Sequence, residues 1–82
     1  MKFTLISTPN CAECKAAEQM LTMRGHEVEV VKVGDTVEGQ VIDLAFIMDT
    51  FKQRQVPQFL AEDGSAILGG YDGVLKYIAE NK

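Results

Sequence analysis

The sequence has 82 residues, 46% of them hydrophobic and 24% charged, and its formal net charge is −4. This length predicts one domain over residues 1–82, since two halves would be too small to bury separate cores. The acidic balance provides no basic surface to neutralise phosphates, which excludes nucleic acid from the expected partners.

The N-terminal segment has no secretory or membrane pattern. Lys2 precedes only a few apolar residues, and no apolar run approaches the roughly 18 residues that cross a bilayer. We therefore expect a cytoplasmic protein that does not associate with a membrane. In that reducing compartment, two closely spaced cysteines are more often catalytic or metal-binding than structural.

The N-terminal part of the chain predicts a strand, a helix and a second strand. Residues 3–7 form a short apolar run rich in strand-forming residues, and Pro9 ends it. Apolar side chains recur on one helical side from residue 12 to residue 24, and Gly25 is of the type that ends a helix. Residues 27–33 are β-branched and nearly alternating, so a parallel second strand follows. The helical residues expected to face the core are Ala16, Ala17, Met20, Leu21 and Met23.

The remaining chain predicts a helix, a hairpin and a last helix. Residues 35–40 include Gly39 and short polar side chains, which favours a loop. A helix follows this loop and is predicted to end near residues 52–55. Strands follow at residues 56–61 and 66–68, joined by a turn, and the last helix runs from about Asp72 to Glu80. The order βαβαββα defines an α/β protein with a four-stranded mixed sheet flanked by three helices. The middle helix is expected to bury Val41, Leu44, Ala45, Met48 and Phe51, and the four methionines are also expected in the core.

Cys11 and Cys14 stand where the first strand gives way to the first helix. Residues three apart on a helix have Cβ atoms about 5–6 Å apart, so this pair can close a disulfide with little backbone movement. A ring this short constrains the unfolded chain weakly, which favours a redox role over a stabilising one. Unpaired N–H groups at the helix cap favour an anion, so we expect Cys11 to be the exposed nucleophile and Cys14 the more buried resolving thiol.

Three separated features resemble one family. They are Cys11-Ala12-Glu13-Cys14 after the first strand, Val56-Pro57 at the start of the third, and Gly69-Gly70-Tyr71-Asp72 before the last helix. With their spacing, which covers nearly the whole chain, they resemble a glutaredoxin of the thioredoxin superfamily. The resemblance implies a thioredoxin-like fold and a thiol-disulfide oxidoreductase that uses glutathione as reductant, with no metal cofactor.

The chain also departs from the family pattern. Ala12-Glu13 replaces the common Pro-Tyr and resembles the small dithiol glutaredoxins of phages and bacteria, including donors to ribonucleotide reductase. Thr8 stands where many members have Lys, and Gly73 stands where a second Asp is frequent. We therefore expect the pKa of Cys11 to be lowered less than in members with the basic residue, although Lys15 compensates in part.

A glutathione site is implied by the same resemblance. Pro57 would be the cis-proline beside the nucleophile, and Val56 would offer its backbone N–H and C=O to an extended thiol peptide. Asp72 would bind the glutathione α-amino group or only cap the last helix, and Tyr71 would flank the dithiol or only pack. The side chains of Lys52, Gln53 and Arg54, which precede the proline, would bind a glutathione carboxylate or only be solvated. The implied site comprises Thr8, Lys52, Gln53, Arg54, Val56, Pro57, Gly70, Tyr71 and Asp72.

Three functions are compatible with these residues. The first is a monomeric glutaredoxin that reduces protein disulfides or glutathione mixed disulfides, with ribonucleotide reductase as one candidate partner. The second is a dithiol donor that thioredoxin reductase reloads. The third is a non-enzymatic module that binds glutathione or a metal cluster, for example one shared between two subunits through Cys11 and glutathione. His26 is expected to be packed or at the surface, since two cysteines and one histidine cannot alone complete a usual zinc site.

Overall fold

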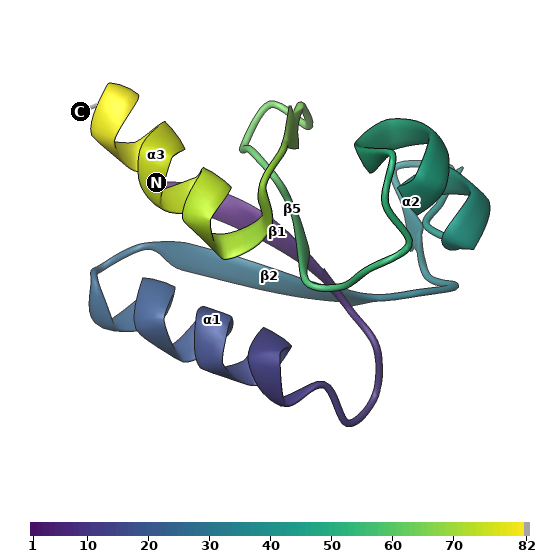
Figure 1. Ribbon diagram of the computed structural model, residues 1–82, viewed down its shortest axis with the longest axis horizontal. Helices are drawn as coiled ribbons and strands as arrows, with labels where there is room; N and C mark the ends of the chain where they lie inside the picture. The colour runs from purple at the N-terminus through teal and green to yellow at the C-terminus, as the bar shows by residue number, and fades with distance from the viewer. Residues whose placement is uncertain (82) are drawn as a thin grey trace.

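The computed structural model describes residues 1–81 and contains a four-stranded mixed sheet in the order β2-β1-β5-β6 (Figure 1). Its central strand β1 pairs with β2 in parallel and with β5 in antiparallel fashion, and β5 pairs with β6 in antiparallel fashion. This arrangement confirms the predicted fold class. The strands are β1 (Lys2–Ser7), β2 (Glu27–Lys32), β5 (Gln58–Leu60) and β6 (Ala66–Ile67).

Three helices flank the sheet. Helices α1 (Ala12–Met23) and α3 (Gly70–Glu80) lie toward one end of the molecule, and α2 (Leu44–Phe51) lies toward the other (Figure 1). None of the helices within residues 1–81 is both long and apolar enough to span a bilayer.

The alternation of side chains along β1 divides the core into two clusters. Phe3 and Leu5 point to one face, where they pack with residues of α1 and α3, including Leu21 and Val74. Ile6 points to the other face and packs with residues of α2. Because β1 is buried on both faces and paired at both edges, it holds the helices of the two layers in fixed positions.

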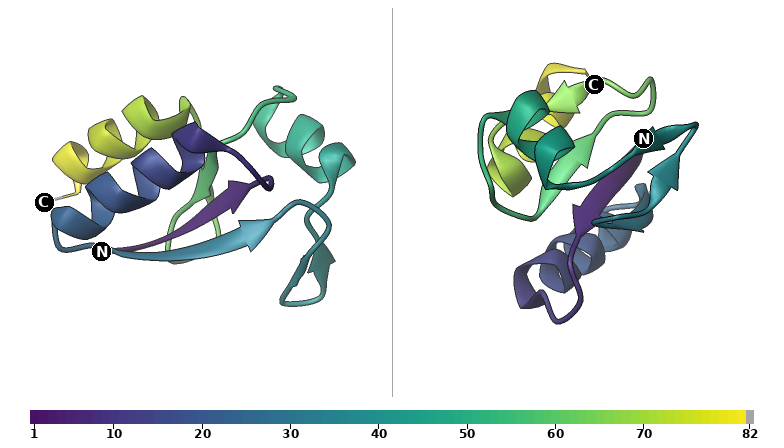
Figure 2. Two further views of the ribbon diagram at one scale, coloured as in Figure 1. Left: turned by 90° about the horizontal axis from the view of Figure 1, so that it is seen from below. Right: turned by 90° about the vertical axis from the view of Figure 1, so that its right-hand side faces the viewer.

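A second, two-stranded sheet occupies the segment that was predicted to be a loop. Strands β3 (Thr36–Val37) and β4 (Gln40–Val41) form an antiparallel hairpin that projects from the end of β2, at the lower right of the left view in Figure 2. Its turn residues Glu38 and Gly39 both have positive φ, 50° and 84°, as a two-residue hairpin turn requires. The loop prediction was wrong because Glu-Gly is a weaker turn signal than Asn-Gly or Asp-Gly.

The hairpin also changes the inward face of α2. The helix begins only after Asp43, whose side chain accepts a hydrogen bond from the Phe46 backbone N–H at 2.9 Å. Ile47 and Phe51 are buried, together with Ile42 ahead of the helix. The predicted stripe is therefore wrong in part, because its count began at a residue that belongs to a strand. Val41, Leu44 and Met48 of that stripe are 46%, 51% and 44% exposed, and Ala45 is exposed as well.

The methionines were also predicted wrongly as core residues. Their exposed fractions are 43% for Met1, 45% for Met20, 86% for Met23 and 44% for Met48. In α1 the buried residues are Cys14, Ala17 and Leu21, which form a narrower stripe than predicted because the helix covers the sheet with only one line of side chains.

The last helix starts two residues earlier than predicted. Its N-cap residue is Gly69, so no side chain caps the helix. Asp72 lies in the first turn. The capping role considered for Asp72 is therefore not observed. Gly73 packs so closely against the Leu68 carbonyl group that a Cβ atom there would overlap with it. This contact explains why a glycine stands where the family frequently has Asp.

Two smaller expectations are confirmed. The turn before β6 forms around Asp63, which accepts hydrogen bonds from the Ser65 backbone N–H at 3.0 Å and hydroxyl at 2.6 Å. These bonds lower the pKa of the Asp63 carboxyl. His26 is a packed residue, because its ring lies edge-on against Phe3 with centroids 5.6 Å apart.

Replacing Gly73 by alanine is expected to lower the free energy of unfolding by roughly 1–3 kcal/mol, because the new methyl group overlaps with backbone atoms of Leu68. Elsewhere in a helix the same change normally stabilises by about 0.5–1 kcal/mol, so the sign is informative. Urea unfolding checks it, with Lys76→Ala on the exposed side of α3 as a control that should change stability by less than about 0.5 kcal/mol. A stabilised Gly73→Ala variant would contradict the close contact.

Candidate active site at the start of helix α1

The two cysteines meet at the N-terminus of α1. Cys11 is the N-cap residue, and its Sγ accepts a hydrogen bond from the Cys14 backbone N–H at 3.2 Å. The cysteines are joined in a disulfide, with their Cα atoms 5.3 Å apart. A sulfur in this position faces the unpaired N–H groups of the first helical turn, which stabilise negative charge when the pair is reduced.

Burial distinguishes the two sulfurs. Cys14 is only 3% exposed and belongs to the core cluster of Phe3 and Leu5. Cys11 is half-buried and packs at the edge of that cluster. A substrate can therefore reach Cys11 but not Cys14, as expected for a nucleophile and a resolving thiol.

The segment that precedes β5 lies beside this helix. The Val56–Pro57 peptide bond is cis, as the resemblance implies. Gln58, only 2% exposed, anchors the segment because its side-chain amide donates to the Gln55 carbonyl oxygen at 3.0 Å and to Gln53 Oε1 at 3.4 Å. The buried amide thereby fixes the course of the chain on the approach to the proline.

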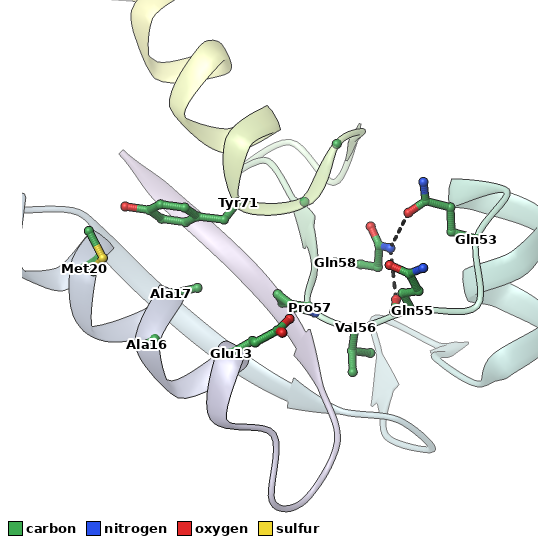
Figure 3. Close-up of a pocket in the computed structure, with 12 residues that line it drawn as sticks. Glu13, Ala16, Ala17, Met20, Gln53, Gln55, Val56, Pro57, Gln58 and Tyr71 are labelled. Atoms are coloured by element: carbon green, nitrogen blue, oxygen red, sulfur yellow. Dashed lines mark hydrogen bonds between the residues drawn. The ribbon is translucent and has the colours of Figure 1, made fainter.

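A groove of about 510 Å³ separates α1 from this segment and from the start of α3 (Figure 3). One wall is the α1 face that carries Glu13 and Met20, and the other contains Val56, Pro57 and Tyr71. The groove is thus open to solvent and can hold an extended ligand; it reaches the turn of the dithiol at Glu13, and neither cysteine is part of its lining. Its lining consists of Glu13, Ala16, Ala17, Met20, Gln53, Gln55, Val56, Pro57, Gln58, Gly69, Gly70 and Tyr71.

The structure brings part of the implied glutathione site together. The members that line the groove are Gln53, Val56, Pro57, Gly70 and Tyr71.

Four other members lie outside this lining. Lys52 and Arg54 are exposed, and Lys52 adopts a left-handed conformation at the C-cap of α2. Asp72 is exposed on the first turn of α3, and Thr8 lines a different recess. The groove as it stands therefore contains amide groups from this set but none of its charged groups.

The different recess, of about 350 Å³, lies against both cysteines on the side of the β1–α1 connection. Two cationic side chains line it, Lys15 from α1 and Lys32 from the end of β2. The recess also contains Glu18, so the dithiol is flanked by a recess with two lysines and one glutamate and by a groove whose one charged side chain among the described residues is Glu13.

Several groove residues were not singled out by sequence reasoning. Glu13, Ala16, Ala17 and Met20 have the spacing i, i+3, i+4 and i+7, which places them on one face of a helix. That spacing could have identified this face, but the apolar members were assigned to the core and Glu13 to another side. Gln55 and Gln58 carried no signal, because their roles depend on the fold of the segment around Pro57.

Tyr71 packs, which is one of the two roles considered for it, and a place beside the dithiol stays a prediction. Its ring packs against the core cluster near Cys14 and also lines the groove, extending from α3 toward Met20 (Figure 3). Its hydroxyl group is buried without a hydrogen-bond partner among residues 1–81. Within the same residues, no three His, Cys, Asp or Glu side chains come together as ligands for a metal ion.

Comparison with known proteins identifies the fold by structure only. No protein-family model matches the sequence, and no curated protein does either. A buckwheat glutaredoxin solved in complex with glutathione superposes with a TM-score of 0.70 at 22% identity, over 98% of this chain and 70% of that one. The holo form of glutaredoxin C1 from Populus tremula x tremuloides gives 0.68 at 24% identity, over 96% and 75%.

The fold is that of the glutaredoxins. A glutathione S-transferase from Xanthobacter autotrophicus matches as well, with a TM-score of 0.65 at 22% identity, over 98% of this chain and 38% of that one. The same architecture is thus used by a protein with another activity, so the function of this chain has to be argued from its site.

The capping role of Cys11 can be tested by two substitutions measured with the wild-type protein under reducing conditions. Serine is a strong N-cap residue and should retain the bond to the Cys14 N–H, whereas alanine cannot accept it. Cys11→Ala is therefore expected to be less stable than Cys11→Ser by about 1 kcal/mol in urea unfolding. Equal stabilities would contradict a capping contribution from this side chain.

Proposed function

We propose that this protein is a dithiol thiol-disulfide oxidoreductase of the glutaredoxin type, which reduces protein disulfides or glutathione mixed disulfides and takes its electrons from glutathione. The observation that carries the proposal is the pairing of a half-buried Cys11 at the cap of α1 with a buried Cys14 one turn further in. The glutaredoxin fold supports it, as does a solved relative in fold that holds glutathione.

In the proposed reaction, the Cys11 thiolate attacks one sulfur of a substrate disulfide. A new bond forms between Cys11 and that sulfur, and the other substrate sulfur leaves as a thiolate that takes a proton from water. Cys14 then loses its proton to water and attacks the Cys11 sulfur, which closes the Cys11–Cys14 disulfide and releases the first substrate sulfur. Two glutathione molecules restore the dithiol and become glutathione disulfide.

Val56 and Pro57 border the groove where the substrate chain would lie. We propose that the backbone of Val56 pairs with an extended substrate segment, as in the addition of a short strand. Gln53 and Gln55 would supply amide hydrogen bonds to a glutathione carboxylate. We further propose that the protein acts as a cytoplasmic monomer and that ribonucleotide reductase is one candidate for its physiological partner.

A second candidate changes only the electron source. The groove lining within residues 1–81 has no cation that would bind the carboxylates of glutathione, and it contains a glutamate. This observation favours a dithiol donor that a thioredoxin reductase reloads. Turnover of a small glutathione mixed disulfide with glutathione and glutathione reductase tests the first candidate, and reduction of a protein disulfide with thioredoxin reductase tests the second.

Replacing Cys14 by serine is expected to retain deglutathionylation and to abolish catalysed reduction of protein disulfides, because only the second reaction needs a resolving thiol. Cys11→Ser should lose both activities while remaining folded, since serine keeps the cap. Both variants are assayed in the glutathione-coupled and reductase-coupled systems. Loss of both activities in Cys14→Ser would contradict the assigned roles, and activity with thioredoxin reductase alone would select the second candidate.

A further inference from the structure

The groove has a negative charge at its wall next to the dithiol. Glu13 lies between Cys11 and Cys14 in the chain, is exposed, and extends from the first turn of α1 toward Pro57 (Figure 3). Among the groove-lining residues in the described part of the chain, it is the one ionised side chain. A ligand that is bonded to Cys11 and extends into this groove therefore passes this carboxylate.

Nothing else in the lining neutralises that charge. The rest of the lining consists of alanines, glycines, Met20, Tyr71, Gln53, Gln55, Val56, Pro57 and Gln58, which contribute apolar surface and neutral amides, and the exposed Arg54 lies outside it. The closest cation in the sequence, Lys15, lines the recess on the other side of the dithiol. The groove is consequently suited to a mostly apolar substrate segment that places one basic side chain beside Glu13.

We propose that Glu13 selects disulfide substrates that have a Lys or Arg next to the reactive cysteine. This inference rests on the proposed dithiol activity and names the substrate class for the same site. In this proposal the substrate sulfur is bonded to Cys11, the N-cap residue, and the neighbouring substrate residue extends over the first turn of α1, which carries Glu13. A cationic side chain there pairs with the carboxylate, whereas an acidic one is repelled by it.

A purely structural role for Glu13 makes a different prediction. An acidic residue in the first turn of a helix stabilises it through the helix dipole, whatever the substrate. In that case, replacing Glu13 lowers the melting temperature of the reduced protein and leaves the choice among substrates unchanged. The ratio of rates on two oppositely charged substrates separates the two roles, because changes in the reactivity of Cys11 cancel in that ratio.

The probes are three N-acetylated tripeptide amides, Lys-Cys-Lys, Gln-Cys-Gln and Glu-Cys-Glu, each as its mixed disulfide with thionitrobenzoate. Reduced protein attacks the peptide sulfur, thionitrobenzoate leaves as a coloured thiolate, and Cys14 then displaces the peptide thiol by closing the disulfide with Cys11. Second-order rate constants at low salt are divided by those for a small free thiol, which removes differences in the intrinsic reactivity of the peptides. The variants are Glu13→Gln, Glu13→Lys and Glu18→Gln. The last is a matched charge control on the same helix, because it removes a carboxylate that lines the recess on the other side of the dithiol and not the groove.

The wild-type protein should prefer the Lys peptide over the Glu peptide by about two- to fivefold, which lies within the range of a solvent-exposed ion pair. Glu13→Gln should reduce the preference to about one and Glu13→Lys should reverse it, while Glu18→Gln should keep the wild-type ratio. Raising the salt concentration should weaken the preference, since exposed charges are screened.

Two failures can be told apart. If all three peptides react at measurable rates without a charge preference, or if Glu18→Gln loses the preference as Glu13→Gln does, selection by Glu13 is overturned and the dithiol activity stands. If no peptide reacts faster with the protein than with the small thiol, the proposed function itself is overturned, and the inference with it.

Discussion

The antiparallel pairing of β1 with β5 is the constraint on which the candidate site depends. Ile6 is opposite Gln58 in this ladder, so the chain just before Gln58 must emerge beside the end of β1. A connection of three residues leads from the end of β1 to Cys11, and the residue before Gln58 is Pro57. Pairing in the centre of the sheet thus brings together a dithiol and a proline that lie far apart in the sequence.

Within this frame, the first turn of α1 sets the chemical difference between the sulfurs. Helical geometry turns Cys14 into the core, while the cap position leaves Cys11 at the rim. The same turn directs Glu13 to the groove and Lys15 to the recess on the other side. One helical turn thereby determines both which sulfur meets a substrate and which charge the substrate meets on each side.

The groove also shows how far a family pattern extends to this chain. Val56, Pro57, Gly70 and Tyr71, which the resemblance assigns to a glutathione site, line the same groove. The expected charged partners of glutathione do not line the groove: Lys52 is at the end of α2, and Asp72 is exposed on α3. The fold is thus shared with the glutaredoxins, whereas the charged side chains of the implied site lie outside the groove.

The sequence by itself determined the order of the main elements, the one-turn spacing of the cysteines and the position of the proline, because each of these is a local property of periodicity, turn chemistry or motif. It did not determine the inward face of α2 or the β3–β4 hairpin, since both depend on where a strand ends and a helix begins. It also missed the groove face of α1 that carries Glu13 and Met20. Periodicity shows which residues share a helix face but not whether that face meets the sheet or solvent, and only the tertiary packing of α1 beside Pro57 and Tyr71 decided that.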